Sequence, residues 1–356
     1  MSSEYTFSLS PVESVDEVIE IWKSVEDHSH SIFFLSHHWM KCWLEAVKTK
    51  PYVFVARNED NPIAIGFLQT TPPAFPFISP PITRLNQTGN REENTIYIEM
   101  NGLLCHSDYP DLQLQCWQWV REQAPNFQLE RLSTNAYDAM KESFPNLAIT
   151  KIDIAPFLNF QKLAQNNIPV LDSFSKNTRQ QIRRAIKIYA AKSPIEIQRP
   201  ENSEHANEYL DRLILFHQKT WQRRGEKGAF DSSFFTHFHK SLIKKSFQHG
   251  IIDLVKFSTQ DLEIGYLYNF IYKNRCYSYQ SGFNYSTDNR LKSGLLCHAL
   301  IAEDYLGKGF DQYNFLAGDS RYKRSLSNDE EPLYSVNTAG HNAASILKQK
   351  IKSFFN

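Results

Sequence analysis

The sequence predicts an α/β (α+β) protein built from two similar halves, and three observations support this. The chain has 356 residues, the length of about two domains of 150–200 residues. Hydrophobic residues make up 41% and aromatic residues 13%, so a large core can form and disorder is excluded. A similar order of helices and strands also occurs twice along the chain.

Two hairpins carry the clearest part of this repeat. Residues 53–69 and 253–269 each contain an apolar stretch, a polar turn and a second apolar stretch, which is typical of a hairpin. The run Ile65-Gly66-Phe67-Leu68 aligns with Ile264-Gly265-Tyr266-Leu267, 199 positions later. The segments before each hairpin align over the same offset and predict an amphipathic helix in front of each.

The same series of elements is expected after each hairpin: a glycine-bearing strand, a polar loop, a helix and a short strand. In the first half the strand with Gly102 is 96–105, the helix is 112–121 and the short strand starts at Gln128. In the second half the strand with Gly282 is 276–285, the helix is 295–306 and the short strand starts at Gln312. Four elements in one order indicate duplication. We therefore expect domains at 1–165 and 195–356, joined by a helix within 172–193.

The connecting helix has a basic face. Ser173 or Ser175 is a suitable N-cap. Lys176, Arg179, Arg183 and Lys187 follow at helical spacing. Such a stripe is either a solvated surface or a contact for phosphate or an acidic substrate, and both interpretations stay open.

Charge and cysteine usage narrow the class of protein. Lys+Arg and Asp+Glu both number 39, so the net charge is zero, which argues against general nucleic-acid binding. The five cysteines are scattered without a CxxC pair and are expected to be reduced. The start of the chain does not resemble a signal peptide, and there is no apolar run of about 20 residues. We expect a cytoplasmic protein with no transmembrane segment and no bound metal.

The two halves differ at the loop before the second helix. In the second half this loop carries two cations, a small hydroxyl residue and a glycine just before an apolar helix, at Asn289, Arg290, Leu291, Lys292, Ser293 and Gly294. Backbone N–H groups at a helix start favour an anion. The first-half loop, residues 106–114, has two aspartates and a proline. We expect the first half to be a degenerate copy that does not bind phosphate.

Three blocks of the second half resemble a known family. They are LFHQKTWQRRG (215–225), YSYQSGFNYSTDNRLKSGLL (277–296) and FLAGDSRYKRS (315–325). They are similar to the cellulose-biosynthesis-associated (CelD-type) GNAT acetyltransferases, although Asn284 stands where that family prefers Asp. Two such units joined by a helix resemble the tandem GNAT arrangement of FemABX-type transferases. The resemblance implies two tandem GNAT-like domains, each with a mixed, mainly antiparallel sheet flanked by helices.

The resemblance also implies a donor site for acetyl-CoA or another acyl-CoA as co-substrate. The residues expected to line the pantetheine arm are Gln280, Ser281, Gly282 and Phe283. Those expected to hold the phosphates are Asn289, Arg290, Leu291, Lys292, Ser293 and Gly294.

The expected catalytic groups lie mostly in the third block. Asp319 is a candidate base for the acceptor amine, Tyr322 a candidate acid for the leaving thiolate, and Lys323 a candidate for stabilising the oxyanion. Alternatively, Asp319 and Lys323 form a structural ion pair. His217 is either part of the site or a satisfied buried histidine. Trp221 and the proline-rich loop with Phe75 and Phe77 are expected as walls of the acceptor site.

These features predict an acyl-CoA-dependent N- or O-acyltransferase. The acceptor is expected to be a small molecule, a lipid or a sugar precursor. One alternative is a FemABX-like transferase that uses aminoacyl-tRNA, the one interpretation that needs nucleic acid. The other alternative is a non-catalytic binding protein on a GNAT scaffold.

Overall fold

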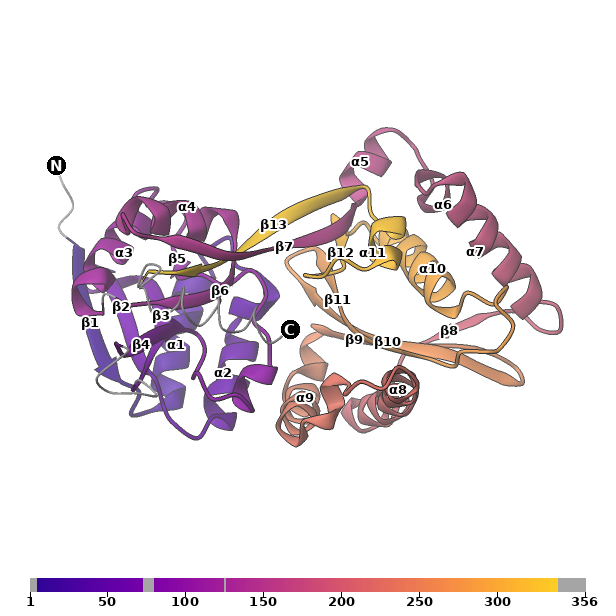
Figure 1. Ribbon diagram of the computed structural model, residues 1–356, viewed down its shortest axis with the longest axis horizontal. Coiled ribbons are helices and arrows are strands. Elements are labelled where there is room, and N and C mark those ends of the chain that lie inside the picture. Colours follow the sequence, from indigo (N-terminus) through magenta and orange to yellow (C-terminus); the bar gives the residue numbers. More distant parts are fainter. Residues whose placement is uncertain (1–4, 73–79, 125, 339–356) are drawn as a thin grey trace, which may run out of the picture. The chain divides into compact units, whose positions relative to one another are not determined.

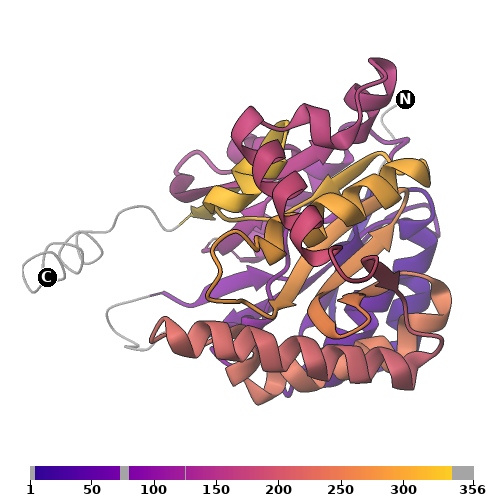
Figure 2. The same ribbon diagram turned by 90° about the vertical axis from the view of Figure 1, so that its right-hand side faces the viewer.

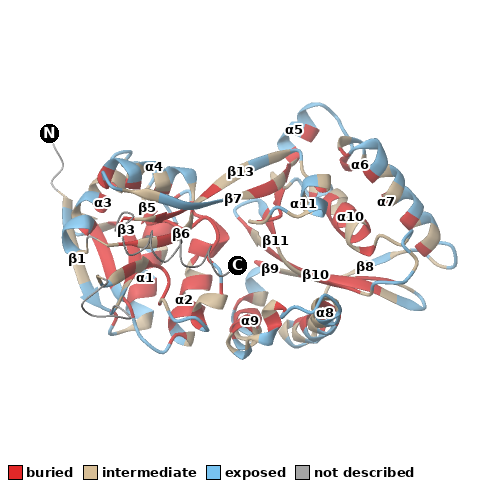
Figure 3. Cartoon of the chain, viewed as in Figure 1, coloured by how far each residue is buried: buried red, intermediate tan, exposed pale blue. Residues whose placement is uncertain are grey.

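The computed structural model describes residues 5–72, 80–124 and 126–338 (Figure 1). They divide into two compact units. The first comprises residues up to Asp153 together with those from Pro332, and the second runs from Ile154 to Glu331. Each unit has its own buried core, one around Trp117 and the other around Tyr305 (Figure 3).

The first unit is an antiparallel sheet in the order β1-β2-β3-β4, with β5 also paired to β3. Its elements are β1 (Tyr5–Pro11), α1 (Val15–Glu26), α2 (His37–Ala46), β2 (Tyr52–Asn58), β3 (Asn61–Thr71), β4 (Ile82–Leu85), β5 (Leu104–Cys105), α3 (Leu112–Gln123), β6 (Gln128–Leu132) and α4 (Thr134–Ser143). Strand β3 is buried over Ile63–Leu68, which explains its nearly continuous apolar sequence.

The second unit contains strands in the order β7-β12-β11-β10-β9-β8. Its elements are β7 (Ala148–Asn159), α5 (Phe160–Gln165), α6 (Val170–Ser173), α7 (Lys176–Tyr189), β8 (Glu196–Gln198), α8 (Ser203–Arg223), α9 (Ser233–Ser246), β9 (Ile252–Thr259), β10 (Leu262–Tyr272), β11 (Arg275–Phe283), α10 (Ser293–Gly307), β12 (Gln312–Asn314) and α11 (Arg321–Leu326). Strand β13 (Asp329–Asn337) begins in this unit and ends in the first. Helices α8 and α9 cover one face of the sheet, and α7 and α10 cover the other (Figures 1 and 2).

The two hairpins occupy the same topological position, as the repeat predicts. In each unit a strand is followed by two helices and then by the hairpin, and the first strand pairs with the first strand of that hairpin. The series helix, short strand, helix follows in both units, as α3-β6-α4 and α10-β12-α11. The predicted fold class, with mainly antiparallel sheets flanked by helices, is confirmed.

One expected strand is much shorter than predicted. Of segment 96–105, only β5 at Leu104–Cys105 is a strand. The Asn101 side chain instead donates to the Leu85 carbonyl oxygen at 3.0 Å and accepts from the Asn86 amide at 3.0 Å. These side-chain bonds replace the backbone ladder that a strand would form, so the prediction for this segment was wrong.

The chain passes between the units inside two strands. Strand β7 follows α4, yet its last residues, Phe157–Asn159, pair with β12 in the second unit. Strand β13 follows α11, yet its last residues pair with β6 in the first unit. The units therefore differ from the domains expected at 1–165 and 195–356, because residues 154–165 complete the second unit and residues from 332 complete the first.

Helix α7 confirms the predicted helix after Ser175. The Ser175 hydroxyl accepts from the Thr178 N–H at 3.2 Å and so caps the helix. Its apolar face, including Ile182, Ala185 and Tyr189, is buried in the core of the second unit. The helix is therefore a packed element of that unit, in addition to connecting the two halves of the sequence.

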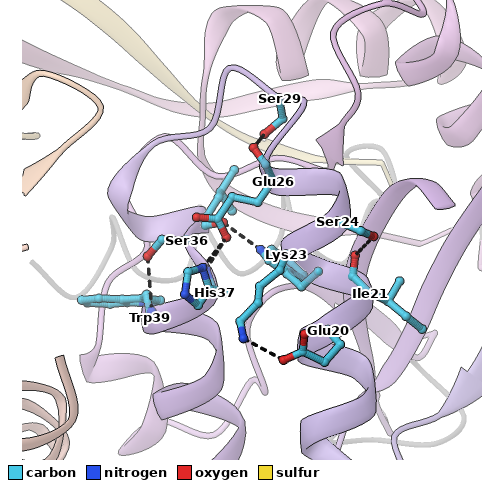
Figure 4. A network of polar contacts seen from close by, with 11 residues as sticks. Glu20, Ile21, Lys23, Ser24, Glu26, Ser29, Ser36, His37 and Trp39 are labelled. Atoms are coloured by element: carbon cyan, nitrogen blue, oxygen red, sulfur yellow. Dashed lines mark hydrogen bonds and ion pairs between the residues drawn. The ribbon is translucent and has the colours of Figure 1, made fainter. Parts of the chain in front are cut away.

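A polar corner fixes the start of α2 in the first unit (Figure 4). The Glu26 carboxylate is buried and accepts from the His37 backbone N–H at 2.5 Å and contacts His37 Nδ1 at 3.1 Å. Ser36 caps the helix by accepting from the Trp39 N–H at 3.3 Å. His37 is thus held by a carboxylate at a helix start.

Candidate active site

Gly282 on β11 is required by helix packing. A Cβ at this position would lie 2.2 Å from the Leu213 carbonyl oxygen of α8 and 2.9 Å from the Leu213 carbonyl carbon. The strand and the helix backbone therefore touch here. This contact accounts for the glycine without a ligand, which the sequence interpretation did not foresee.

The next residue, Phe283, points to the opposite face of the sheet. Its ring centroid lies 5.9 Å from that of His298 on α10 and 5.8 Å from that of Tyr285. A Cβ at Gly294 would lie 3.3 Å from the Phe283 ring. The structure therefore brings together the end of β11 and the start of α10. Gln280 and Ser281 precede Gly282 on β11 and are partly buried.

The start of α10 lacks a side-chain cap. Lys292 is its N-cap residue and makes no side-chain capping hydrogen bond. Ser293 is buried, and its hydroxyl pairs with the Tyr189 hydroxyl of α7 at 2.9 Å. The first N–H groups of any α-helix have no partner within the helix. The uncapped start of this 15-residue helix therefore offers donors and a positive dipole end to an anion.

The loop before α10 holds its arginine in an ion pair. Arg290 donates to both carboxylate oxygens of Asp288, at 2.9 and 2.8 Å, and this contact lowers the pKa of Asp288 to about 2. Arg290 and Asn289 are exposed, and Leu291 is partly buried. Of the two predicted phosphate-binding cations, Arg290 is thus already paired with a carboxylate.

Tyr322 on α11 lies over α10. Its ring stacks on His298, with centroids 5.5 Å apart and an interplanar angle of 19°. Desolvation by surrounding side chains, helped by Tyr285, raises the pKa of Tyr322 to about 12, although 38% of the residue is exposed. The hydroxyl is therefore protonated at neutral pH.

Lys323 holds the loop that precedes α11. Its ammonium group donates to the carbonyl oxygens of Leu316 at 3.1 Å and Ala317 at 2.8 Å. Leu316 and Gly318 have positive φ angles of 61° and 128°, so this loop has an unusual backbone path. The Lys323 ammonium thus stabilises the loop.

Asp319 pairs with Arg324 and not with Lys323. The Arg324 guanidinium donates from Nε and Nη2 to the two carboxylate oxygens of Asp319. Both side chains are more than half exposed. Asp319, the expected base, is therefore close to Tyr322 in the sequence and forms a bidentate ion pair with Arg324.

His217 lies on α8, which covers the other face of the sheet from α10 (Figure 2). The Trp221 indole N–H donates to His217 Nε2 at 2.9 Å, so the ring proton lies on Nδ1 and donates to the Gln218 side-chain oxygen at 3.0 Å. Burial lowers the pKa of His217. The two predicted partners do interact, and the histidine is neutral with both nitrogens bonded. Phe75 and Phe77 lie outside the described residues.

His298 is a site residue that the sequence interpretation missed. It is buried, and its Nδ1 lies 2.9 Å from the Tyr313 hydroxyl. The Tyr313 hydroxyl donates to Asn269 Oδ1 at 3.4 Å, and Asn269 Nδ2 donates to the Tyr305 hydroxyl at 2.8 Å. The Tyr305 hydroxyl in turn donates to the Asp253 carboxylate at 2.6 Å. Because the Asp253 carboxylate can only accept, each group in this series donates toward it. His298 therefore donates from Nδ1 to the Tyr313 hydroxyl, and its Nε2 carries no proton. Nε2 has no hydrogen-bond partner in the described part of the chain.

Burial lowers the pKa of His298 to about 3. The residue is therefore neutral beneath Tyr322 at physiological pH. A single histidine in the apolar run Leu295–Ala302 gave no signal, because a lone histidine in such a run is usual in a core.

Residues 176–324 match the family model described as "Acetyltransferase (GNAT) domain". This match identifies the larger part of the second unit as a GNAT acetyltransferase domain, and the protein as a transferase. No curated protein matches the chain.

Solved structures with the same fold cover nearly the whole chain. A structure of FemX has a TM-score of 0.59 at 10% identity, covering 93% of this chain and 96% of that one. The C-terminal domain of a putative lysylphosphatidylglycerol synthetase from Agrobacterium fabrum has a TM-score of 0.55 at 10% identity and covers 94% and 95%. The L-PGS structure from Bacillus licheniformis has a TM-score of 0.53 at 8% identity and covers 93% and 94%. These TM-scores show a shared fold, and at such low identities they show nothing more. The CelD-type resemblance stays a prediction.

Within the described ranges, no three His, Cys, Asp or Glu side chains are grouped so that they could hold a metal ion. None of the helices in those ranges combines the length and the apolar character that a membrane crossing requires.

Proposed function

We propose that the protein is an acyl-CoA-dependent N- or O-acyltransferase, with its donor site at the start of α10. The observation that carries the proposal is the uncapped start of α10 directly beside the end of β11. There, free backbone N–H groups and Lys292 suit a diphosphate. Phe283 supplies an apolar surface for the pantetheine arm. In the described part of the first unit, α3 also starts without a side-chain cap, but it follows an acidic segment with Asp108 and Asp111, which would repel a diphosphate.

In the reaction, the acceptor amine or hydroxyl attacks the thioester carbon directly and the CoA thiolate leaves. Tyr322 is protonated at neutral pH and is placed above α10, so it supplies the proton that the leaving thiolate takes up. Asp319 accepts the proton of the acceptor once its carboxylate is released from Arg324. Lys323 acts by holding the loop at Leu316–Gly318 in place. The remaining rate enhancement comes from holding the two reactants together.

His217 has a supporting role in this proposal. Both of its ring nitrogens are bonded within α8, so we assign it to the wall of the second unit together with Trp221. Arg290 contributes to the phosphate site only if it leaves Asp288. We therefore expect Lys292 to be the more important cation of the loop.

Two features support the aminoacyl-tRNA alternative: the fold shared with FemX and the exposed basic side chains of α7. Lys176, Arg183, Arg184 and Lys187 are exposed, and a tRNA acceptor end would need such a surface. Arg183 already pairs with Asp172 at 3.3 Å, and the net charge of the chain is zero. We therefore favour acyl-CoA.

Calorimetric titration of the full chain with acetyl-CoA, longer acyl-CoAs and aminoacyl-tRNA tests the proposal. The decisive variant is Lys292→Glu, because a carboxylate at a helix start is favourable for the helix and leaves the fold intact while it repels phosphate. Lys219→Glu on α8 is the matched control, since it makes the same charge change at an exposed helix position outside the last turn. We expect acyl-CoA binding in the wild type and the control and its loss in Lys292→Glu. Binding of aminoacyl-tRNA without acyl-CoA binding would contradict the proposal.

A further inference from the structure

A pocket lies in the second unit, and none of its lining residues belongs to α10. It has a volume of about 570 Å³ and opens to solvent between the start of α7 and α11. Its lining is mostly polar and consists of Ser173, Phe174, Ser175, Thr178, Asp319, Arg321, Arg324, Ser325 and Ser327. None of the residues expected to bind acyl-CoA takes part in it.

Two cationic side chains and one carboxylate line the pocket. Arg321 and Arg324 both line it from α11. The N-terminus of the 14-residue helix α7 forms the facing wall, with Ser175 as its cap, and adds the positive end of a helix dipole. Arg179 lies behind that wall and donates to the carbonyl oxygens of Asp172 and Phe174 at 3.0 and 2.9 Å. Asp319 is the one acidic residue in the lining.

Asp319 shows which chemical group this pocket accepts. Its carboxylate occupies the fork of Arg324, with each oxygen taking one N–H. A guanidinium fork matches a carboxylate or a phosphate in this way. The contact is exposed, so an incoming anion can reach Arg324 and compete with Asp319 for it.

We propose that this pocket binds a carboxylate or phosphate group of the acceptor, which displaces Asp319 from Arg324. The assignment to the acceptor rests on the proposed function, whereas the anion site itself does not. Displacement frees the Asp319 carboxylate to accept a proton, so the base becomes available only when an acidic acceptor is bound. This gives the ion pair a role in substrate selection.

The position of Tyr322 fits this arrangement. In an α-helix successive residues are about 100° apart, so Arg321, Arg324 and Ser325 share one face of α11 and Tyr322 lies beside it. An acceptor whose acidic group is held by Arg321 and Arg324 therefore has its remaining atoms next to the proposed proton donor. We infer an acceptor that carries its acidic group a short distance from its amine or hydroxyl.

The test is calorimetric titration of the full chain with inorganic phosphate and, separately, with succinate, in the absence of acyl-CoA. Asp319→Asn removes the internal competitor, so we expect it to raise the affinity about two- to fivefold, the range for an exposed ion pair. Arg324→Gln should abolish binding. Lys187→Gln, which removes an exposed cation of α7 outside the lining, is the control and should bind as the wild type does.

Three further measurements keep the proposal falsifiable. Arg324→Lys keeps the charge and removes the fork, so it should weaken binding even if Arg324→Gln does not fold. Lys292→Glu should still bind phosphate in this pocket, which separates the pocket from the donor site. If the donor-site proposal is wrong, the titration with acyl-CoA fails and this phosphate binding is unaffected. Tighter binding of phosphate or of succinate identifies the acidic group. Equal or weaker binding in Asp319→Asn, or wild-type binding in Arg324→Gln, would overturn the proposal.

Discussion

Replacing Gly282 with alanine tests the contact between β11 and α8. The added Cβ would lie 2.2 Å from the Leu213 carbonyl oxygen and 3.0 Å from the Leu213 Cα. These are backbone atoms of a long helix, so the strand or the whole helix has to move. Overpacking of this kind costs about 1–3 kcal/mol, and a rigid backbone neighbour places the cost at the upper end. Alanine recovers about 0.5–1 kcal/mol because it restricts the unfolded chain. We expect a net loss of about 2 kcal/mol.

The assay is thermal unfolding followed by near-UV circular dichroism. For a unit of this size, a loss of 1 kcal/mol lowers the melting temperature by about 2–4 °C, so Gly282→Ala should melt about 4–8 °C below the wild type. Gly294→Ala is the matched control. Its nearest neighbours are side-chain atoms of Phe283 at 3.3 Å and Tyr285 at 3.6 Å, and alanine favours the helix by about 1 kcal/mol. We expect its melting temperature within about 3 °C of the wild type.

A Gly282→Ala variant that melts with the wild type would refute the reasoning, because the two backbones would then be further apart than the structure shows. Equal destabilisation by Gly294→Ala would also refute it. In that case the start of α10 would be packed too tightly for a ligand to approach.

The remaining predictions concern pH and catalysis. His239 is buried on α9. Burial lowers the folded-state pKa values of His239 and His298 to about 3, against about 6.5 in the unfolded chain. The stability they contribute is complete above pH 6.5 and falls as the pH drops, by up to about 1.4 kcal/mol per pH unit for each. Denaturant midpoints between pH 6.5 and 5 should show this slope, and His298→Gln should reduce it; a flat profile would contradict the burial. Tyr322→Phe should lower turnover about 10²-fold or more with unchanged acyl-CoA affinity, and full turnover would exclude Tyr322 as the proton donor.

Several elements of the second unit could be predicted because local sequence determines them. The apolar runs of β9 and β10, the Ser175 cap of α7 and the apolar run of α10 each satisfy one local rule. The strand prediction for segment 96–105 was wrong because the Asn86 and Asn101 side chains form hydrogen bonds there in place of a strand ladder. No periodicity signals such a pair.

The passage of β7 and of β13 from one unit into the other could not be predicted either. Strand patterns show that a segment is extended, and they do not show which strand it pairs with. Gly282 was interpreted as a place for a ligand, whereas its neighbour is the Leu213 backbone. Asp319 was recognised as chemically important, but its partner, Arg324, depends on the turn of a short helix.

The donor site is the central claim, and amide hydrogen exchange tests it most directly. Exchange is measured by mass spectrometry on the full chain with and without saturating acetyl-CoA. We predict slower exchange in residues 289–296 and unchanged exchange at the start of α3, residues 112–115. The same protection should be absent in Lys292→Glu. Unchanged exchange at the start of α10, or protection at α3 in its place, would contradict the account.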